Sequence, residues 1–237
     1  MAAPEHVLVT RPAGQADDLM ASLDAAGIRA SHVPALSITP LPLAAAARQW
    51  LFDLDHYRAV VVVSVNAAHM LLDHLQTIWP QWPQDLPFVA VGPATAAVLA
   101  AEGVDVVMPP SGFNSEAVLD LPLWHSFRDG KVLLAAGEGG RTLLTDTLRD
   151  SGFVVDNLVL YRRGCDQAFR WPSEPVDALM VTSEDGWHCL EAKVPADCIV
   201  LAGSERIADV IRLTFTGRVL AARSPRDEDM MALMETL

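Results

Sequence analysis

The chain is short of positive charge. Its 237 residues include 17 lysines and arginines against 30 aspartates and glutamates, which gives a net charge of −13. Because binding to a phosphate backbone needs a basic surface, this balance excludes a protein that binds nucleic acid non-specifically. An anionic small ligand would have to be held by local donors, such as backbone N–H groups at helix starts and a few arginines.

Cysteines and long apolar runs are also scarce. The three cysteines, Cys165, Cys189 and Cys198, have neither CxxC nor zinc spacing, and we interpret them as ordinary thiols of a reducing compartment. No apolar run approaches the roughly 20 residues of a membrane-spanning helix, and the first residues do not follow the pattern of a secretory signal. These features predict a cytoplasmic protein that does not contact the membrane.

Standard catalytic motifs are missing as well: there is no P-loop, nucleophile elbow, HExxH motif or acidic calcium loop. The seven histidines include no pair at metal-ligand spacing, so we predict no metal site. The acidic run Arg226–Asp229 is typical of a solvated helix start. The turn Gly137–Arg141 leaves two interpretations open, a tight loop before a helix or a contact with an anion.

What the sequence does contain is an internal repeat. Residues 7–27 align without a gap to residues 132–152, so that Thr10 falls on Ala135 and Gly27 on Gly152. A looser pair aligns residues 59–109 with residues 178–222, with Gly92 on Gly203. The chain therefore runs in the order A, B, A′, B′.

The repeated segments predict strands that alternate with helices. Each A segment has an apolar run, leucines four residues apart, a glycine that suits a helix end, and a second extended run. Each B segment has two buried strands, at 60–63 and 88–91 or at 178–181 and 199–201, each followed by a helix. This alternation predicts parallel sheets covered by helices on both faces. Prolines after the first A segment and the stretch Trp171–Pro175 mark the expected crossings between domains.

Small polar residues recur where the predicted strands end. In an open parallel sheet these carboxyl ends form the ligand crevice, although each such residue alone is more often a helix N-cap. Arg11 and Arg141 lie on the same edges, where they could pair with carboxylates or form surface salt bridges. The hydroxyl and amide residues concerned are Thr10, Ser64, Asn66, Thr95, Ser115, Ser183 and Ser204.

An ordered series of short motifs along nearly the whole chain resembles the uroporphyrinogen-III synthase family. The motifs are Val9-Thr10-Arg11-Pro12, Ser64-Val65-Asn66, Val91-Gly92-Pro93-Ala94-Thr95-Ala96, Asn114-Ser115-Glu116, Gly140-Arg141 with Leu144 and Leu148, and Val159-Leu160-Tyr161-Arg162. The resemblance implies two α/β lobes, each a parallel sheet with helices on both faces, joined by a two-stranded connection. Residues 1–36 with 174–237 would form the first lobe, and residues 41–165 the second.

The resemblance also implies an activity. The family closes the linear tetrapyrrole hydroxymethylbilane to uroporphyrinogen III, with loss of water and inversion of the last pyrrole and without a cofactor. The substrate carries eight carboxylates, which suits an edge rich in N–H and hydroxyl donors. A monomer that briefly contacts the preceding hydroxymethylbilane synthase is the expected form.

The implied site centres on Tyr161, which matches a family tyrosine and is our candidate acid, although a phenol is only a modest acid. Thr95 matches a family threonine and is expected to hold a carboxylate or water, with Gly92 opening its helix. Where the family often has a second such threonine, this chain has Gly203-Ser204-Glu205-Arg206, so Ser204 or Arg206 would substitute. Tyr161 remains open to a purely packing role.

Two other interpretations compete with this one. The same crevice could clamp an anionic metabolite without turnover, as a sensor or regulatory module. A nucleotide-dependent enzyme that uses Gly137–Arg141 is the third possibility.

Overall fold

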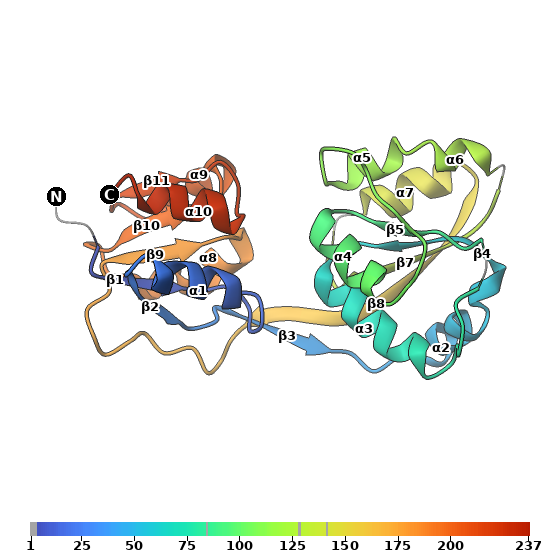
Figure 1. Cartoon of the computed structure of the whole chain (residues 1–237), viewed down its shortest axis with the longest axis horizontal. Coiled ribbons are helices and arrows are strands. Elements are labelled where there is room, and N and C mark those ends of the chain that lie inside the picture. The colour runs from blue at the N-terminus through green and yellow to red at the C-terminus, as the bar shows by residue number, and fades with distance from the viewer. Residues whose placement is uncertain (1–3, 84, 128, 141) are drawn as a thin grey trace. The chain divides into compact units, whose positions relative to one another are not determined.

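The computed structural model describes residues 4–83, 85–127, 129–140 and 142–237 (Figure 1). The chain divides into two compact units: unit 1 comprises Met1–Ser37 and Gly164–Leu237, and unit 2 comprises Ile38–Arg163. None of the helices in these ranges has the length and apolar character needed to cross a bilayer.

Unit 1 is a five-stranded sheet in the order β11-β10-β9-β1-β2, and its neighbouring strands pair in parallel. Its strands are β1 (His6–Val9), β2 (Arg29–His32), β9 (Ala178–Val181), β10 (Ile199–Ala202) and β11 (Val219–Ala221). Its helices are α1 (Asp17–Ala25), α8 (Glu184–Leu190), the 3-10 turn η2 (Glu191–Lys193), α9 (Glu205–Thr214) and α10 (Asp227–Met234).

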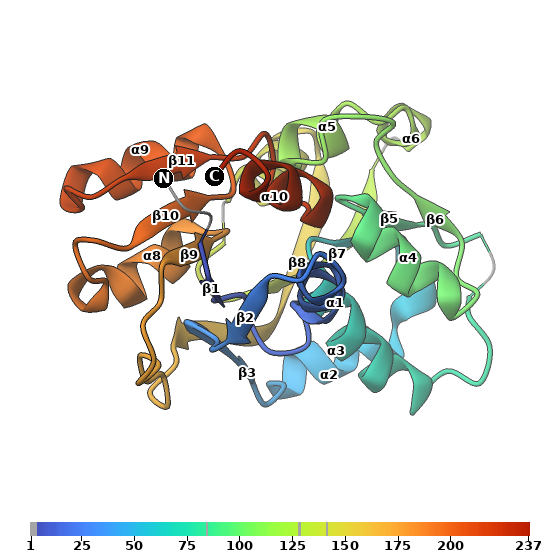
Figure 2. The same cartoon turned by 60° about the vertical axis from the view of Figure 1, so that its left-hand side comes forward.

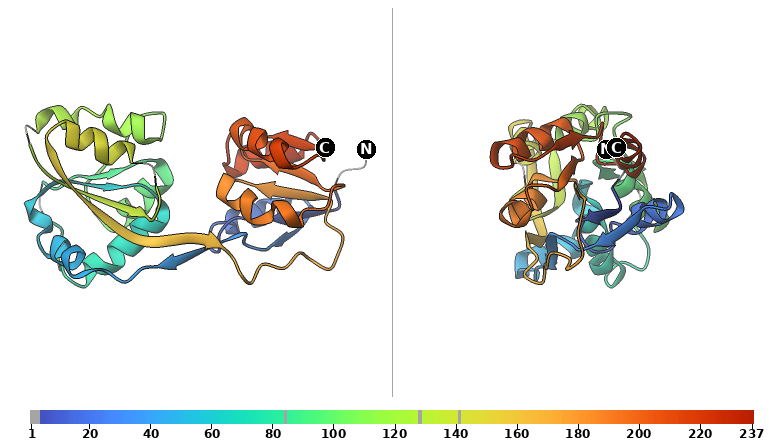
Figure 3. Two further views of the ribbon diagram at one scale, coloured as in Figure 1. Left: turned by 180° about the vertical axis from the view of Figure 1, so that it is seen from behind. Right: turned by 90° about the vertical axis from the view of Figure 1, so that its left-hand side faces the viewer.

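The central strands of this sheet are covered on both faces, which is why β1, β9 and β10 are almost wholly apolar, whereas the edge strand β2 is polar and partly exposed. Along β1, Leu8 packs into a core with residues of α8 and α9, whereas Val7 and Val9 pack into a core with residues of α1 and α10. Figure 1 shows α1 and α10 on one face, and the view from behind in Figure 3 brings α8 and α9 forward.

Unit 2 repeats this architecture with additions. Its sheet has the order β3-β8-β7-β4-β5-β6. The strands are β3 (Leu36–Pro40), β4 (Tyr57–Val62), β5 (Phe88–Ala90), β6 (Val106–Val107), β7 (Gly130–Gly137) and β8 (Phe153–Cys165). The helices are α2 (Ala45–Phe52), the 3-10 turn η1 (Leu54–His56), α3 (Val65–Gln76), α4 (Pro93–Ala101), α5 (Ser115–Leu119), α6 (Leu123–Ser126) and α7 (Leu143–Asp150).

The two faces of β4 again supply two cores. Val60 and Val62 pack with residues of α2, α3 and α4, and Ala59 and Val61 pack with residues of α5, α6 and α7. Figure 2 shows α5 and α6 on one side of β5 and β6, with α3 and α4 on the other. The predicted fold class, parallel sheets covered on both faces, is confirmed.

The two units are joined through β3 and β8. The amide of Leu41 donates to the carbonyl of Leu160, and the amide of Asp166 donates to the carbonyl of Ala35, so the two strands run in opposite directions. The second crossing therefore lies inside β8, between Arg163 and Gly164, and not in the Trp171–Pro175 stretch, which belongs to unit 1. The chain crosses in the long paired strand β8, and the proline-rich stretch that was expected to mark this crossing lies after it.

The cysteines differ from the sequence interpretation. Cys165 at the end of β8 and Cys189 in α8 form a disulfide, and only Cys198 remains a buried free thiol. The pair is 24 residues apart in sequence, and its Cα atoms lie 5.3 Å apart. Sequence spacing did not reveal this pair, because the packing of α8 brings the two residues together.

Candidate functional site

In each unit, the predicted site residues gather at the carboxyl edge of a parallel sheet. In unit 2, Ser64 follows β4 and Gly92 follows β5, while in unit 1 Thr10, Ser183 and Ser204 follow β1, β9 and β10. Ligands of open α/β sheets bind at such edges, because the turns there present backbone donors and helix N-termini.

Tyr161 is the most enclosed polar group at the unit 2 edge. It lies on β8, is only 4% exposed, and its hydroxyl is 3.0 Å from Oγ of Ser64. Ser64 also caps α3, because its Oγ accepts a hydrogen bond from the amide of Ala67 at 3.1 Å. The structure thus links the candidate acid to the start of a helix through a serine hydroxyl.

Gly137 makes the position of Tyr161 possible. A Cβ atom built on Gly137 would lie 2.5 Å from the Tyr161 ring, far inside van der Waals contact. The pairing of β7 with β8 shifts register between Ala136 and Gly137, so that Gly137 faces Tyr161. The ring therefore lies directly over the backbone of the last residue of β7.

The turn after β7 borders a small cavity of about 150 Å³, whose polar lining includes Thr145 and Asn157. These two side chains are already bonded to each other, with Oγ1 of Thr145 donating to Oδ1 of Asn157 at 2.9 Å. Small-molecule sites are usually larger, about 300–1,000 Å³. The geometry of the described residues favours a tight loop before α7 over a nucleotide site. Arg141, predicted to bind substrate, lies outside the described residues.

The other predicted residues of unit 2 lie at helix starts. Gly92 is the N-cap of α4, Thr95 is buried in the first turn of that helix, and Asn66 is in the first turn of α3. Ser115 is the first residue of α5, but the residue that caps this helix is Asn114, whose Oδ1 accepts from the amide of Ala117 at 2.9 Å. Ser115 is therefore not needed as a cap.

At the unit 1 edge, three predicted residues already serve the local structure. Thr10 is buried, and its hydroxyl donates to the carbonyl of Met180 at 2.7 Å, which ties β1 to β9. Ser183 and Ser204 cap α8 and α9 by accepting from the amides of Gly186 and Ile207. The N-cap alternative holds for both serines.

The arginines of this edge are paired. Arg11 donates to Oδ1 of Asp227 at 2.5 Å and to the carbonyl of Pro225 at 2.7 Å, and its side chain is only 12% exposed. Arg206, one of two candidates to replace the missing threonine, is exposed and pairs with Glu184. Arg11 thus holds the loop before α10 in place.

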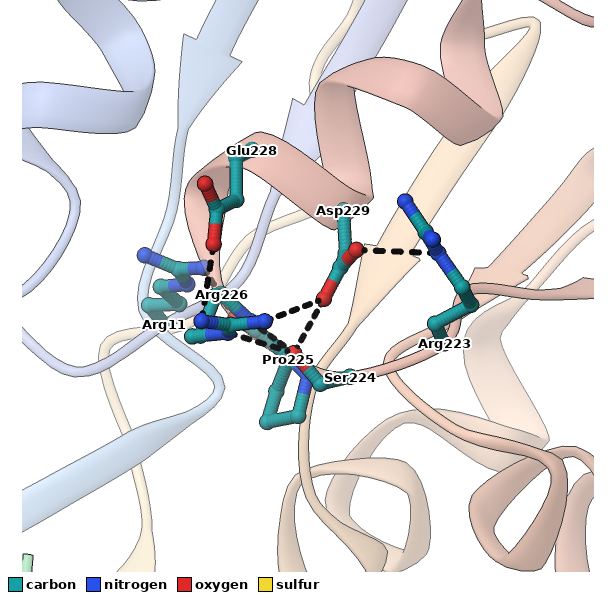
Figure 4. Close-up of polar contacts among 7 residues, drawn as sticks. All are labelled: Arg11, Arg223, Ser224, Pro225, Arg226, Glu228 and Asp229. Atoms are coloured by element: carbon teal, nitrogen blue, oxygen red, sulfur yellow. Dashed lines mark hydrogen bonds and ion pairs between the residues drawn. The ribbon is translucent and has the colours of Figure 1, made fainter.

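The same loop contains residues that the sequence analysis missed. Asp229 belongs to the run interpreted as a solvated helix start, yet it is only 5% exposed. Figure 4 shows its contacts with Ser224, Arg223 and Arg226. A hydrogen bond from Ser224, together with the nearby guanidinium groups of Arg223 and Arg226, holds the pKa of the Asp229 carboxyl below its usual range. A charged residue on the inner face of an amphipathic helix is the sequence signal for such a buried carboxylate.

A second missed residue is Phe113 of unit 2. Its side chain is 47% exposed, its φ is +37°, and its Cβ would lie 3.5 Å from a Cβ built on Gly92. Phe113 thus combines an exposed aromatic ring with a left-handed backbone conformation, which marks a constrained surface position beside the start of α4. Within the described ranges, no three histidine, cysteine, aspartate or glutamate side chains are grouped in a way that would hold a metal ion.

Fold and site together define a class of protein: two α/β units that offer hydroxyl, amide and backbone donors at the carboxyl edges of their parallel sheets. Comparison with known proteins narrows this class. The family model described as uroporphyrinogen-III synthase HemD matches residues 17–232. The chain belongs to the uroporphyrinogen-III synthase family, an enzyme family of tetrapyrrole synthesis, which confirms the resemblance seen in the sequence.

Individual relatives agree. The chain is 30% identical over 224 residues to uroporphyrinogen-III synthase of Escherichia coli K12, which covers 87% of this chain and 90% of the relative. Among solved structures, uroporphyrinogen-III synthetase of Helicobacter pylori matches with a TM-score of 0.66 at 14% identity, over 98% of this chain and 99% of that one. A mutant uroporphyrinogen III synthase of Thermus thermophilus matches with a TM-score of 0.64 at 15% identity, over 98% and 97% of the two chains. These structures share the fold.

Proposed function

We propose that this protein is a hydro-lyase that converts hydroxymethylbilane to uroporphyrinogen III, with loss of water and inversion of the last pyrrole ring. The observation that carries the proposal is the family match over residues 17–232, nearly the whole chain. The reaction needs no cofactor in this scheme, and the enzyme acts as a cytoplasmic monomer that receives the bilane from hydroxymethylbilane synthase in a transient contact.

Tyr161 is the proton donor in this proposal. The hydroxyl group of the bilane leaves as water only if it is protonated, and the cation that remains then closes the ring through a spiro intermediate. As the Tyr161 phenol gives up its proton, the hydroxyl of Ser64, 3.0 Å away, can donate to the phenolate that forms. No protein nucleophile is required, so positioning of the bilane supplies much of the rate.

The remaining predicted residues divide into two roles. Thr10 and Arg11 already bond to Met180 and to the loop before α10, and we assign them to holding the unit 1 edge. The hydroxyls, amides and helix starts at the two edges bind the carboxylates of the substrate, and the prediction for Arg141 is retained. The residues assigned to binding are Asn66, Gly92, Thr95, Ser115, Ser183 and Ser204, whereas the single hydroxyl proton of Ser64 is assigned to Tyr161.

A coupled assay tests the function. Hydroxymethylbilane is generated in situ, the protein is added, the products are oxidised, and type I and type III uroporphyrins are separated by chromatography. Predominant type III product supports the synthase. Type I alone, the product of spontaneous closure, from folded protein rejects it and favours the binding-module alternative.

Tyr161→Phe tests the proposed acid, and the chain offers a matched control in its only other tyrosine. Tyr57 is also buried in unit 2, but it lies at the opposite end of β4 and donates to Oδ2 of Asp156 at 2.6 Å. We expect Tyr161→Phe to lower kcat by about 10- to 100-fold, at or below the usual range for a lost general acid, without abolishing turnover. Tyr57→Phe should leave kcat unchanged. Complete loss in a folded Tyr161→Phe enzyme, or equal kcat in both variants, contradicts the assignment.

A further inference from the structure

The loop between β11 and α10 in unit 1 places two arginines beside the carboxylate of Asp229 (Figure 4). The side chains of Arg223 and Arg226 are 87% and 70% exposed, whereas that of Asp229 is 5% exposed. A buried carboxylate is costly unless it is paired and hydrogen-bonded. The groups around Asp229 therefore stabilise its negative charge, and the Asp229 carboxylate orients these groups in turn.

Three groups converge on Asp229. Ser224 donates from Oγ to Oδ2 at 2.5 Å, Nη2 of Arg226 lies 3.4 Å from the same oxygen, and Nε of Arg223 lies 3.3 Å from Oδ1. Arg226 also pairs with Glu228 at 2.8 Å, so its charge is shared between two acids. Arg223 contacts Asp229 through Nε. Because the Arg223 side chain is highly exposed, the part of its guanidinium group that does not contact Asp229 faces solvent. Such a guanidinium can bind a second carboxylate with two parallel hydrogen bonds.

The position of the loop places Arg223 on the ligand edge of unit 1. It follows β11, whose neighbour β10 leads into the turn at Gly203 and Ser204. A Cβ atom built on Gly203 would lie only 2.9 Å from Cβ of Pro225, so the loop packs directly against that turn. Arg223 and Ser204 therefore belong to one continuous row of strand ends.

The corresponding loop of unit 2 shows that the fold does not require these charges. Residues 108–114, between β6 and α5, contain no charged side chain, and Asn114 caps the helix. Phe113 there takes the place next to Gly92 that Pro225 takes next to Gly203. The same turn is thus built without arginines and without a buried acid.

We propose that Arg223, held in orientation by Asp229, binds a carboxylate side chain of the tetrapyrrole substrate. Arg223 is the binding residue and Asp229 a positioning residue. This inference rests on the proposed function, because it takes its ligand class from the octacarboxylic bilane. The chain has a net charge of −13, so the protein as a whole does not attract an anionic substrate. A guanidinium group oriented at the ligand edge supplies that attraction locally.

The test compares Arg223→Ala, Arg223→Lys and Asp229→Asn with a matched control, Arg212→Ala. Arg212 is a paired surface arginine of the same unit, located in the last turn of α9 and bonded to Glu205 and Asp209. Losing a charge-assisted pair should raise KM for the bilane about tenfold in Arg223→Ala, with kcat little changed. Arg223→Lys should recover only part of this loss, Asp229→Asn should raise KM less than Arg223→Ala, and Arg212→Ala should match the wild type. Equal KM values for Arg223→Ala and Arg212→Ala overturn the proposal.

A binding measurement separates this inference from the proposed function. Fluorescence titration with uroporphyrin III, which has eight carboxylates, and coproporphyrin III, which has four, needs no turnover. Arg223→Ala should weaken uroporphyrin binding about tenfold and weaken coproporphyrin binding less. Absence of type III product from the wild type defeats the proposed function, whereas titration curves that Arg223→Ala leaves unchanged defeat the role of Arg223. Circular dichroism of each variant shows whether it is folded.

Discussion

Unit 1 and unit 2 carry corresponding strands in the same order. The order β11-β10-β9-β1-β2 of unit 1 matches β6-β5-β4-β7-β8 of unit 2, where β3 adds one more strand beside β8. Segments A and B′ of the repeat build unit 1, and segments B and A′ build unit 2. The chain thus makes one architecture twice, so a feature that only one unit carries is not required by the shared architecture.

Such features lie at the carboxyl edges. Unit 2 presents the Tyr161–Ser64 pair and the exposed ring of Phe113, whereas the matching loop of unit 1 presents Arg223 and Arg226 over a buried acid. In the proposed function, unit 2 supplies the proton donor Tyr161, and in the further proposal unit 1 supplies Arg223 for a substrate carboxylate.

The disulfide provides the largest expected contrast between the units. Cys165 and Cys189 close a loop of 24 residues within unit 1, and in the described part of unit 2 there is no such bond. Removing a crosslink of this length with Cys165→Ser should lower the free energy of unfolding of unit 1 by about 3 kcal/mol, because the unfolded chain regains conformational freedom. Hydrogen exchange followed by mass spectrometry should show the loss in peptides from β9 and β10 and not in those from β4 and β5.

The control for this prediction is reduction. In the presence of a thiol reductant, the wild type and Cys165→Ser should exchange at the same rates, since neither then carries the bond. Equal protection of unit 1 in both proteins under oxidising conditions would show that the bond contributes nothing to stability.

Gly137→Ala tests the glycine on which the Tyr161 site depends. The new methyl group would lie 2.5 Å from the Tyr161 ring, so the ring must shift, which disturbs its 3.0 Å contact with Ser64. We expect a loss of about 1–3 kcal/mol in the free energy of unfolding from overpacking, together with reduced kcat. Gly140→Ala is the control, because among the described residues beyond its chain neighbours its methyl group would have only the carbonyl oxygen of Gly137 within 4 Å, at 3.8 Å. Chemical denaturation measures the free energy of unfolding, and the type III assay measures kcat. Equal values of both for Gly137→Ala and Gly140→Ala would refute the expectation.

The smallest expected effect is a pH dependence confined to unit 1. Ser224, Arg223 and Arg226 lower the pKa of Asp229 in the folded protein, so its contribution to stability is complete above the pKa of the unfolded chain. That contribution is lost as the pH falls below about 4, toward the folded pKa. Asp229→Asn should therefore destabilise the protein at neutral pH and approach the wild type in acid. A difference in unfolding free energy that stays constant from neutral pH into acid would contradict this.

Much of the fold was predictable because its signals are local. Apolar runs fixed the buried strands, and glycines 27 and 152, both with positive φ, follow helix ends as expected. Ser64, Ser183 and Ser204 cap helices, which their place before a helical pattern already indicated. The site was harder to predict, since Thr10 and Arg11 already bond to Met180 and Asp227, partners far away in the sequence that no short motif reveals.

The sequence by itself determined the repeat, the alternation of strands and helices, the family and the edge at which polar residues gather. These features follow from periodicity and from motifs a few residues long. Only the tertiary structure decided the pairing of Cys165 with Cys189, the burial of Asp229 and the contact between Tyr161 and Ser64, which lie 97 residues apart. The physical reason is that each of these depends on how a helix or strand packs against a distant segment, and residue type and local spacing do not encode that packing.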